Sequence, residues 1–332
     1  YGILSHPAIL LREAGIEVKQ SYHLYEKREG GQVLVEDNEP IVIYRIENAP
    51  HSPTANTILS LDEITPDMRE LVGGKAYNLA LLRNHGIPVP EGFVLTTNFY
   101  NEFMQAQGSN ERTVFPQHLI DQLIQQHREL ASNVVAVRSS ATIEDSDNNS
   151  FAGMFRTSLN VSTKDELIQA VLKGFESFNK SHIQGYKDAS AISETGSMAL
   201  VIQPMVDAES SGVMFTRNPV SPNANGMLIN STFGIGEKLV SGQVTGDLFT
   251  INDEGQLVSS EITEKRVKLT ITGEAAVEED ETRKPSLNNL QLQELYRYAG
   301  IVKDIFGGHQ DIEFAVETGG IKILQARPIT TL

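Results

Sequence analysis

Hydrophobic and polar residues follow two different periods along this chain, and together they predict a mixture of helices and strands. Apolar residues that recur about every three to four positions are typical of helices with one buried face, and short apolar runs between turn residues are typical of strands. The predicted helices cover residues 8–15, 75–85, 98–106, 117–131, 165–178 and 290–306. The predicted strands cover 32–35, 41–46, 93–96, 134–137, 157–161, 198–204, 212–216, 226–230, 311–316 and 321–325, with exposed strands and loops within 253–284. Because helices and strands do not alternate regularly, we expect an α+β (mixed α/β) fold.

A polar stretch with neither period, residues 47–57, divides the chain unevenly. It is rich in Asn, Pro, Ser and His, which is typical of a linker. The 332 residues exceed the length of one ordinary domain, so we expect two domains or one domain with several lobes. The chain begins with Tyr1 rather than Met, which we interpret as a sign that it is a piece of a longer protein.

Composition and charge exclude several classes of protein. Hydrophobic residues make up 40% of the chain and charged residues 21%, so it can bury a core and is not disordered. A net charge of −16 repels nucleic acid and anionic membranes, so neither is an expected partner, but a few local groups can still hold a nucleotide. The absence of Cys excludes disulfides, thiolate metal sites and a Cys nucleophile, and it suits a cytoplasmic protein. No apolar run approaches the roughly 18 residues of a membrane-spanning helix, and the start has no signal-peptide pattern.

Three segments are candidates for phosphate binding. The triplet Gly73-Gly74-Lys75 precedes a predicted helix, where backbone N–H groups attract phosphate and a Lys adds a positive charge. Its spacing is not that of a P-loop, and taken alone such a triplet is more often an ordinary turn. Arg138 follows a predicted buried strand, from which its guanidinium could reach a cleft; a surface ion pair with Glu144 or Asp145 is the alternative. The small residues of the loop at 150–153 would let backbone amides approach an oxyanion.

The last two predicted strands carry polar residues at alternate positions. Asp311 and Glu313 point to one side of their strand, as do Gln325 and Arg327 on the next. If the strands pair, two carboxylates, an amide oxygen and a guanidinium share one surface. Such oxygens suit Mg²⁺ bound together with a polyphosphate, and the Arg suits the phosphate itself. The alternative is a solvated face of an edge sheet, which the apolar neighbours in both strands disfavour.

His6 lies directly before a predicted helix that begins with Pro7. The positive end of a helix dipole favours the neutral, nucleophilic imidazole, and the amides there could stabilise a phosphoryl group placed on it. A lone His is more often structural, so the residues alone leave this role open.

Taken together, these motifs resemble the ATP-binding domain of phosphoenolpyruvate synthase and pyruvate phosphate dikinase, a superfamily that also includes rifampin phosphotransferase. The resemblance covers about residues 59–332. It is carried by the segments Gly73-Gly74-Lys75-Ala76, Ile87-Pro88-Val89-Pro90-Glu91-Gly92-Phe93, Val137-Arg138-Ser139-Ser140-Ala141, Ser150-Phe151-Ala152-Gly153, Gln203-Pro204-Met205-Val206, Ser211-Gly212-Val213-Met214-Phe215-Thr216, Gly234-Ile235-Gly236-Glu237 and Gln325-Ala326-Arg327-Pro328.

The start of the chain, from Gly2 to Ile9, resembles part of the phosphohistidine swivelling domain of the same superfamily. The resemblance therefore implies a partial domain of this kind at 1–46 and a linker at 47–58. It implies a two-lobed ATP-grasp fold for the rest, with an N-terminal lobe at 59–202 and a C-terminal lobe at 203–332.

The resemblance also implies a role for individual residues. Its cofactors are ATP and Mg²⁺, and its catalytic residues would be His6, Arg138 and Arg327. The metal would be bound by Glu313 and Gln325. Residues implied in nucleotide binding are Lys75, Arg138, Ser150, Ala152, Gly153, Gln203, Met205, Val206, Glu237, Asp311 and Arg327.

The activity implied is that of a dikinase component, in which an imidazole attacks the β-phosphorus of ATP and AMP is released. The phosphoryl group would pass to pyruvate or another small acceptor through a further domain or subunit. Two alternatives stay open: a small-molecule or antibiotic phosphotransferase similar to rifampin phosphotransferase, and a non-catalytic nucleotide-binding subunit.

Overall fold

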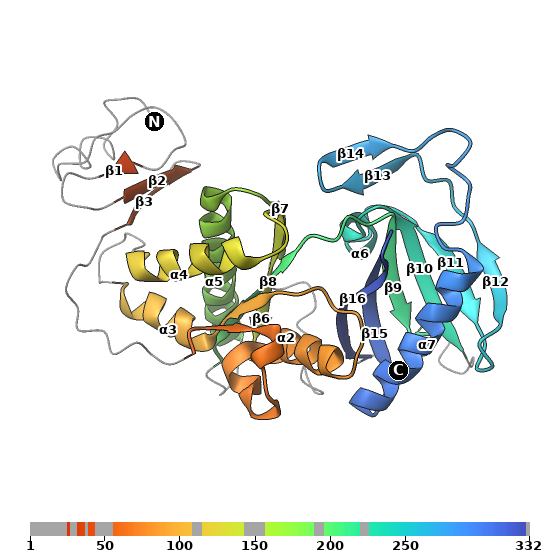
Figure 1. Ribbon diagram of the computed structural model, residues 1–332, viewed down its shortest axis with the longest axis horizontal. Coiled ribbons are helices and arrows are strands. Elements are labelled where there is room, and N and C mark those ends of the chain that lie inside the picture. Colours follow the sequence, from red (N-terminus) through yellow and green to blue (C-terminus); the bar gives the residue numbers. More distant parts are fainter. Residues whose placement is uncertain are drawn as a thin grey trace.

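The computed structural model describes residues 25–26, 32–36, 39–43, 56–107, 115–142, 157–188, 196–219 and 226–329. Within these ranges the chain forms two lobes, each built on its own antiparallel sheet, which lie side by side with helix α2 near their junction (Figure 1). None of the helices in this described part is long and apolar enough to cross a membrane.

The first lobe contains a five-stranded antiparallel sheet in the order β4-β5-β8-β6-β7. The strands are β4 (Ile58–Ser60), β5 (Phe93–Leu95), β6 (Val135–Ala141), β7 (Thr157–Val161) and β8 (Met198–Pro204). The helices are the short η1 (Leu61–Glu63) and η2 (Pro66–Met68), followed by α2 (Arg69–Asn84), α3 (Thr97–Gln105), α4 (Gln117–Glu129) and α5 (Lys164–Asp188).

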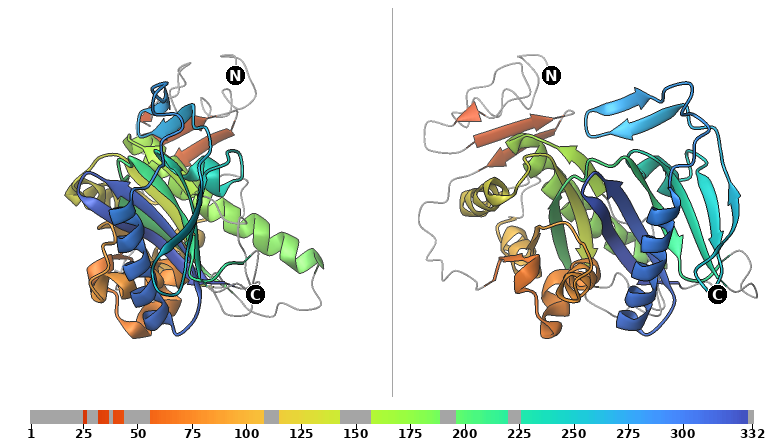
Figure 2. Two further views of the ribbon diagram at one scale, coloured as in Figure 1. Left: turned by 90° about the vertical axis from the view of Figure 1, so that its right-hand side faces the viewer. Right: turned by 45° about the vertical axis from the view of Figure 1, so that its right-hand side comes forward.

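The second lobe contains a six-stranded antiparallel sheet in the order β12-β11-β10-β9-β15-β16, with α7 (Asn289–Phe306) against one face (Figure 2). The strands are β9 (Ser210–Phe215), β10 (Met227–Phe233), β11 (Asp247–Ile251), β12 (Leu257–Glu261), β15 (Gln310–Glu317) and β16 (Gly320–Pro328). The short helix α6 (Glu237–Val240) and a hairpin of β13 (Val267–Thr270) and β14 (Gly273–Ala276) complete this lobe.

A separate three-stranded antiparallel sheet precedes both lobes and contains β1 (Tyr25–Glu26), β2 (Gln32–Glu36) and β3 (Glu39–Ile43). It confirms the strand predicted at 32–35 and the described part of the one predicted at 41–46, which begins at Glu39; residues 44–46 lie outside the described residues. The predicted helix at 8–15 lies outside the described residues.

Strand β8 explains how α2 comes to lie between the lobes, because the two faces of β8 pack into two different hydrophobic clusters. Leu200 and Ile202 pack into the cluster under α3, α4 and α5. Ala199 and Val201 face the other way, into a cluster that contains α2, α7 and the second sheet. A strand covered on both faces has no polar side, which is why its sequence is a continuous apolar run. The cluster shared by the lobes holds α2 at their junction.

The structure confirms the remaining predicted elements but moves several of their ends. Helical residues begin at Arg69 rather than after the glycines, and α5 continues to Asp188. Strand β6 does not end near Val137 but continues through Ala141, with every residue buried. Polar Arg and Ser residues inside a buried strand break the apolar pattern, so the sequence places the strand end too early. The chain passes from the first sheet to the second between Pro204 and Ser210.

Candidate active site

Helix α2 is broken at Gly73, where the backbone adopts φ 75° and ψ 169°. A Cβ at this position would lie 1.9 Å from the carbonyl oxygen of Ser140 on β6, so only Gly fits. The Ser140 hydroxyl joins both sides of the break: it donates to the Val72 carbonyl at 2.8 Å and accepts from the Ala76 N–H at 3.0 Å. The break therefore brings the start of the second helical segment into contact with β6.

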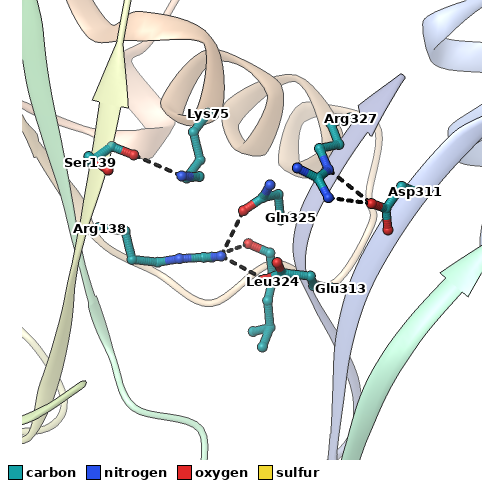
Figure 3. Close-up of polar contacts among 8 residues, drawn as sticks. All are labelled: Lys75, Arg138, Ser139, Asp311, Glu313, Leu324, Gln325 and Arg327. Carbon is teal, nitrogen blue, oxygen red and sulfur yellow. Dashed lines mark hydrogen bonds and ion pairs between the residues drawn. The ribbon is translucent and has the colours of Figure 1, made fainter. Parts of the chain in front are cut away.

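Lys75 lies in the first turn after this break and extends along β6 (Figure 3). Its ammonium donates to the Ser139 carbonyl at 2.9 Å, and only 6% of the residue is exposed. A charged group so deeply buried needs polar partners, and the Ser139 carbonyl is one of them. The predicted Gly-Gly-Lys feature is thus not an ordinary surface turn, because it brings a buried positive charge next to Arg138.

Arg138 extends from β6 of the first lobe to β15 and β16 of the second (Figure 3). One guanidinium nitrogen, Nη2, donates to Glu313 Oε2 at 2.7 Å and to Gln325 Oε1 at 2.8 Å. The other, Nη1, donates to the Leu324 carbonyl at 2.5 Å. The alternative of a solvated strand-end arginine does not hold, because the Arg138 side chain is 11% exposed and pairs across the two lobes.

A β-bulge at Leu324 creates the acceptors for this arginine. Glu313 pairs with Gln325, but the next residue of β15 pairs with Ile323, so Leu324 is an extra residue in β16. A bulge shifts the alternation of side chains by one position. Ile323 before it and Ala326 after it both enter the core, while Gln325 points to the site. Without the bulge, Ile323 and Gln325 would point to the same face.

Asp311 and Arg327 form a second ion pair one step farther along the same two strands. The Arg327 Nε and Nη2 atoms both donate to Asp311 Oδ2, at 2.9 and 2.7 Å. Burial raises the pKa of Asp311 above its ordinary value, and the nearby Arg327 only partly offsets this, while Glu313 adds to the rise. The four polar residues predicted to share one surface, Asp311, Glu313, Gln325 and Arg327, therefore do lie on the same side of β15 and β16.

We expect Arg327→Met to raise the pKa of Asp311 further, because it removes the positive charge that stabilises the carboxylate. The measurement is a carboxyl ¹³C NMR titration of Asp311 in both proteins. Because folding raises the pKa of Asp311, this residue stabilises the folded protein at pH values below 3.8, the pKa of the carboxyl group in the unfolded chain. This stabilisation is lost as the pH rises through the pKa of the folded state. Lys322→Met, on the same strand but paired with Glu317, should leave the titration unchanged. A lower midpoint in Arg327→Met would contradict this reading.

The residues predicted to read the adenine lie at the connection between the sheets. The Gln203 side chain is buried and donates to the Pro90 carbonyl at 2.9 Å. The Met205 N–H donates to the Val134 carbonyl at 2.9 Å, and Val206 follows, partly buried. The Gln203 side chain therefore holds the end of β8 to the segment around Pro90.

Other predicted site residues are not brought together by the described contacts. Glu237 begins α6 and is exposed, and no side-chain contact between it and Glu313 or Gln325 is found among the described residues. His6, Ser150, Ala152 and Gly153, together with Glu144 and Asp145, lie outside the described residues.

Two residues with clear roles in positioning the site were not predicted. Ser140 holds the broken helix, and Asn78 of α2 donates to the Ala326 carbonyl of β16 at 3.1 Å. In the sequence, Ser140 and Asn78 stand out only as polar residues within apolar segments. That pattern does not show which backbone groups they bind.

The side-chain atoms that could bind a metal ion indicate which metal would fit this site. No group of three or more His, Asp or Glu side chains able to hold a metal occurs in the described part of the chain. Glu313 Oε2 and Gln325 Oε1 nevertheless converge on one positively charged atom, Arg138 Nη2. Two hard oxygens meeting at a cationic centre fit Mg²⁺, which proteins usually hold with one or two carboxylates and the phosphates of a substrate.

Comparison with known proteins places this chain in a family. The model of the pyruvate phosphate dikinase AMP/ATP-binding domain matches residues 69–114 and 109–332. The uncharacterized phosphotransferase YvkC of Bacillus subtilis is 36% identical over 79% of this chain and 34% of its own length. Phosphoenolpyruvate synthase of Aeropyrum pernix is 33% identical, covering 82% of this chain and 42% of its own.

Rifampicin phosphotransferase of Bacillus subtilis is 31% identical, covering 84% of this chain and 36% of its own. The chain thus spans about a third to two fifths of the length of these curated relatives. The match to the domain model extends over most of the chain and includes Lys75, Arg138 and the β15–β16 pair. This chain belongs to the family of the pyruvate phosphate dikinase AMP/ATP-binding domain.

Proposed function

We propose that this chain binds ATP with Mg²⁺ between its two lobes and forms the ATP-binding part of a dikinase-type phosphotransferase similar to phosphoenolpyruvate synthase. The observation that carries the proposal is the contact of Arg138 with Glu313 and Gln325, which joins the lobes through charged and polar groups. A nucleoside triphosphate carries negative charge that the cations Lys75, Arg138 and Arg327 could meet. The membership of the family supports ATP as the nucleotide.

The proposed roles follow from the charges of the residues. Lys75, Arg138 and Arg327 would hold phosphate oxygens, and the loop at 150–153 would close over them. Glu313 and Gln325 would bind Mg²⁺, which neutralises phosphate charge as ATP reacts. Arg138 would then exchange its contacts with these two oxygens for contacts with phosphate. Asp311 would orient Arg327 through their ion pair.

The adenine would lie at the connection between the sheets, near Gln203, Met205 and Val206, with Glu237 a further member of the nucleotide site. This arrangement corresponds to an ATP-grasp fold. The catalysis would depend mainly on positioning and on charge neutralisation by Lys, Arg and metal.

The transfer itself would require His6 or an equivalent imidazole. Its nitrogen would attack the β-phosphorus of ATP, the bond to the α-phosphate oxygen would break, and AMP would leave. The imidazole would then carry both the β- and γ-phosphates. Water or inorganic phosphate would remove the γ-phosphate, and the remaining phosphoryl group would reach a small-molecule acceptor, such as pyruvate, through a further domain or subunit. We propose that this reaction takes place in the cytoplasm, because a chain without Cys does not depend on disulfides and is compatible with reducing conditions.

A second candidate is a phosphotransferase acting on an antibiotic or another small molecule. The observation that favours it is the 31% identity to rifampicin phosphotransferase over 84% of this chain. Both candidates share the ATP site and differ in the acceptor.

We expect calorimetry of this chain to detect ATP binding that strengthens with millimolar Mg²⁺. Glu313→Gln should reduce the benefit of Mg²⁺ because it removes a carboxylate from the proposed metal site, whereas Glu317→Gln, farther along β15, should retain it. Absence of ATP binding by a correctly folded sample would end the proposal.

We expect a longer protein that contains this chain and a competent phosphohistidine domain to release AMP from ATP. The nucleotide product can be separated by chromatography after incubation with labelled ATP. Release of ADP would contradict the dikinase reaction while leaving the ATP site intact, and binding without turnover would support the non-catalytic alternative. Loss of acid-labile phosphorylation in His6→Ala would identify the phosphorylated residue.

A further inference from the structure

A cavity with a volume of about 710 Å³ lies in the second lobe, away from the proposed nucleotide site. It is an open cavity, lined by the C-terminal half of α7 and by the chain where β9 and β11 end and where β10 and β15 begin. Its lining includes Thr216, Arg217, Asp253, Tyr296, Arg297, Gly300, Lys303, Asp304 and His309. None of them belongs to the set around Arg138, Glu313 and Arg327. A cavity of this volume has the size of a small-molecule site.

Four basic residues line this cavity although the chain as a whole carries a net charge of −16. They are Arg217, Arg297, Lys303 and His309, of which Arg297 is paired with Glu294 at 3.8 Å. Burial lowers the pKa of His309, and the positive charges of Lys303 and Arg217 lower it further, so these groups are close enough to repel. No ion pair of Lys303 is found among the described residues. An anion in the cavity would relieve this repulsion.

The imidazole of His309 is held in place by the neighbouring strand. Its Nδ1 lies 3.2 Å from the Thr216 hydroxyl, which also accepts a hydrogen bond from the Gln310 N–H at 2.8 Å. The Thr216 N–H in turn donates to the Gln310 carbonyl at 3.0 Å. One basic group is therefore fixed to the end of the sheet, which makes the anion site partly preorganised.

Gly300 keeps the helical wall of the cavity open. It lies inside α7, where Gly is less favourable than Ala for the helix. A Cβ at this position would meet no atom within 4 Å, so packing within the protein does not require Gly here. The missing side chain instead leaves space in the cavity and exposes the helix backbone to its contents.

The other polar groups define what else the ligand carries. Asp253 and Asp304 line the same cavity. The negative charge of Asp253 raises the pKa of His309, whereas Lys303 and Arg217 lower it. Carboxylates accept hydrogen bonds from hydroxyl groups, so the cavity offers acceptors as well as cations. The Tyr296 hydroxyl donates to the Asp253 carbonyl at 2.6 Å, which orients the aromatic ring at the cavity wall.

We propose that this cavity binds a phosphate-bearing small molecule with hydroxyl groups, its phosphate held by Arg217, Lys303 and His309. The shared chemistry is that of a sugar phosphate or a nucleoside monophosphate. This site is separate from the proposed ATP site, and it does not depend on that proposal.

The test is a titration of the full chain with ribose 5-phosphate, AMP and uncharged ribose, followed by the amide NMR signals of Thr216, Gly300 and Lys303. We expect saturable shifts with the two phosphates and none with ribose. Lys303→Met should weaken binding about tenfold, since it removes one charge-assisted contact. Lys284→Met is the matched control, because Lys284 is exposed and pairs with Asp280 and Glu281 away from the cavity; it should bind as the wild type does.

Gly300→Leu adds a second test by filling the cavity, and Gly300→Ala is its control for the helix. We expect Gly300→Leu to lose the saturable shifts while Gly300→Ala remains folded. Equal affinity in Lys303→Met and Lys284→Met would overturn the proposal, as would shifts confined to Lys75 and Arg138. Binding of AMP without ribose 5-phosphate would identify a nucleotide site, and binding of both would identify a site for sugar phosphates in general.

Discussion

Gly73→Ala is expected to destabilise the protein by about 3 kcal/mol or more, combining an unfavourable positive φ with a steric overlap. The backbone at Gly73 has φ 75°, and the added Cβ would meet the Ser140 carbonyl oxygen at 1.9 Å. Neither atom can move without shifting α2 or β6, because Ser140 bonds to both sides of the helix break. The measurement is the free energy of unfolding from urea denaturation.

Gly86→Ala is the matched control for this substitution. Gly86 also has a positive φ, 76°, but a Cβ there would meet no atom within 4 Å. It should therefore cost only about 1 kcal/mol, the part due to backbone conformation. If both variants lose the same stability, the close approach of α2 to β6 is not what requires Gly73.

Arg138→Met is expected to weaken ATP binding by about 100-fold, because a buried charge-assisted contact with phosphate contributes about 1.5–3 kcal/mol. Adenosine binding should change little, since Arg138 is proposed to meet phosphates and not the base. Calorimetry with ATP and with adenosine separates the two effects. Arg327→Ala should show the same selectivity for the phosphate part of the ligand.

Arg283→Met is the control for loss of a positive charge, because the Arg283 side chain is 79% exposed and 3.9 Å from its partner Glu264. It should leave ATP affinity unchanged. An equal loss of ATP and adenosine binding in Arg138→Met would instead indicate that the arginine supports the arrangement of the lobes. No loss at all would remove Arg138 from the proposed site.

Much of the architecture was predictable because periodicity is a local property of the chain. The strands at β7 and β8 begin and end where the sequence predicts them, and α7 begins one residue early. The prediction was wrong where polar residues are buried. Arg138 and Ser140 lie inside β6, and their burial depends on partners that come from α2 and from β15 and β16.

The sequence by itself determined the fold class, the identity of the family and the set of charged residues at the candidate site. Segment motifs such as Val137-Arg138-Ser139-Ser140-Ala141 carry that information because they are contiguous. It also predicted that Asp311 and Glu313 share a face, as do Gln325 and Arg327, since strand geometry has a period of two.

Only the tertiary structure decided which of these residues meet. Arg138 and Glu313 are 175 positions apart, and their contact requires both sheets and α2 to be in place. The bulge at Leu324 and the break at Gly73 likewise have their reasons in distant chain segments, Arg138 and Ser140. The cavity around Lys303 and His309 had no signal in the sequence, because its basic residues come from separate elements. Local patterns report which face of an element is buried, whereas the partner on that face is set by how distant elements pack together.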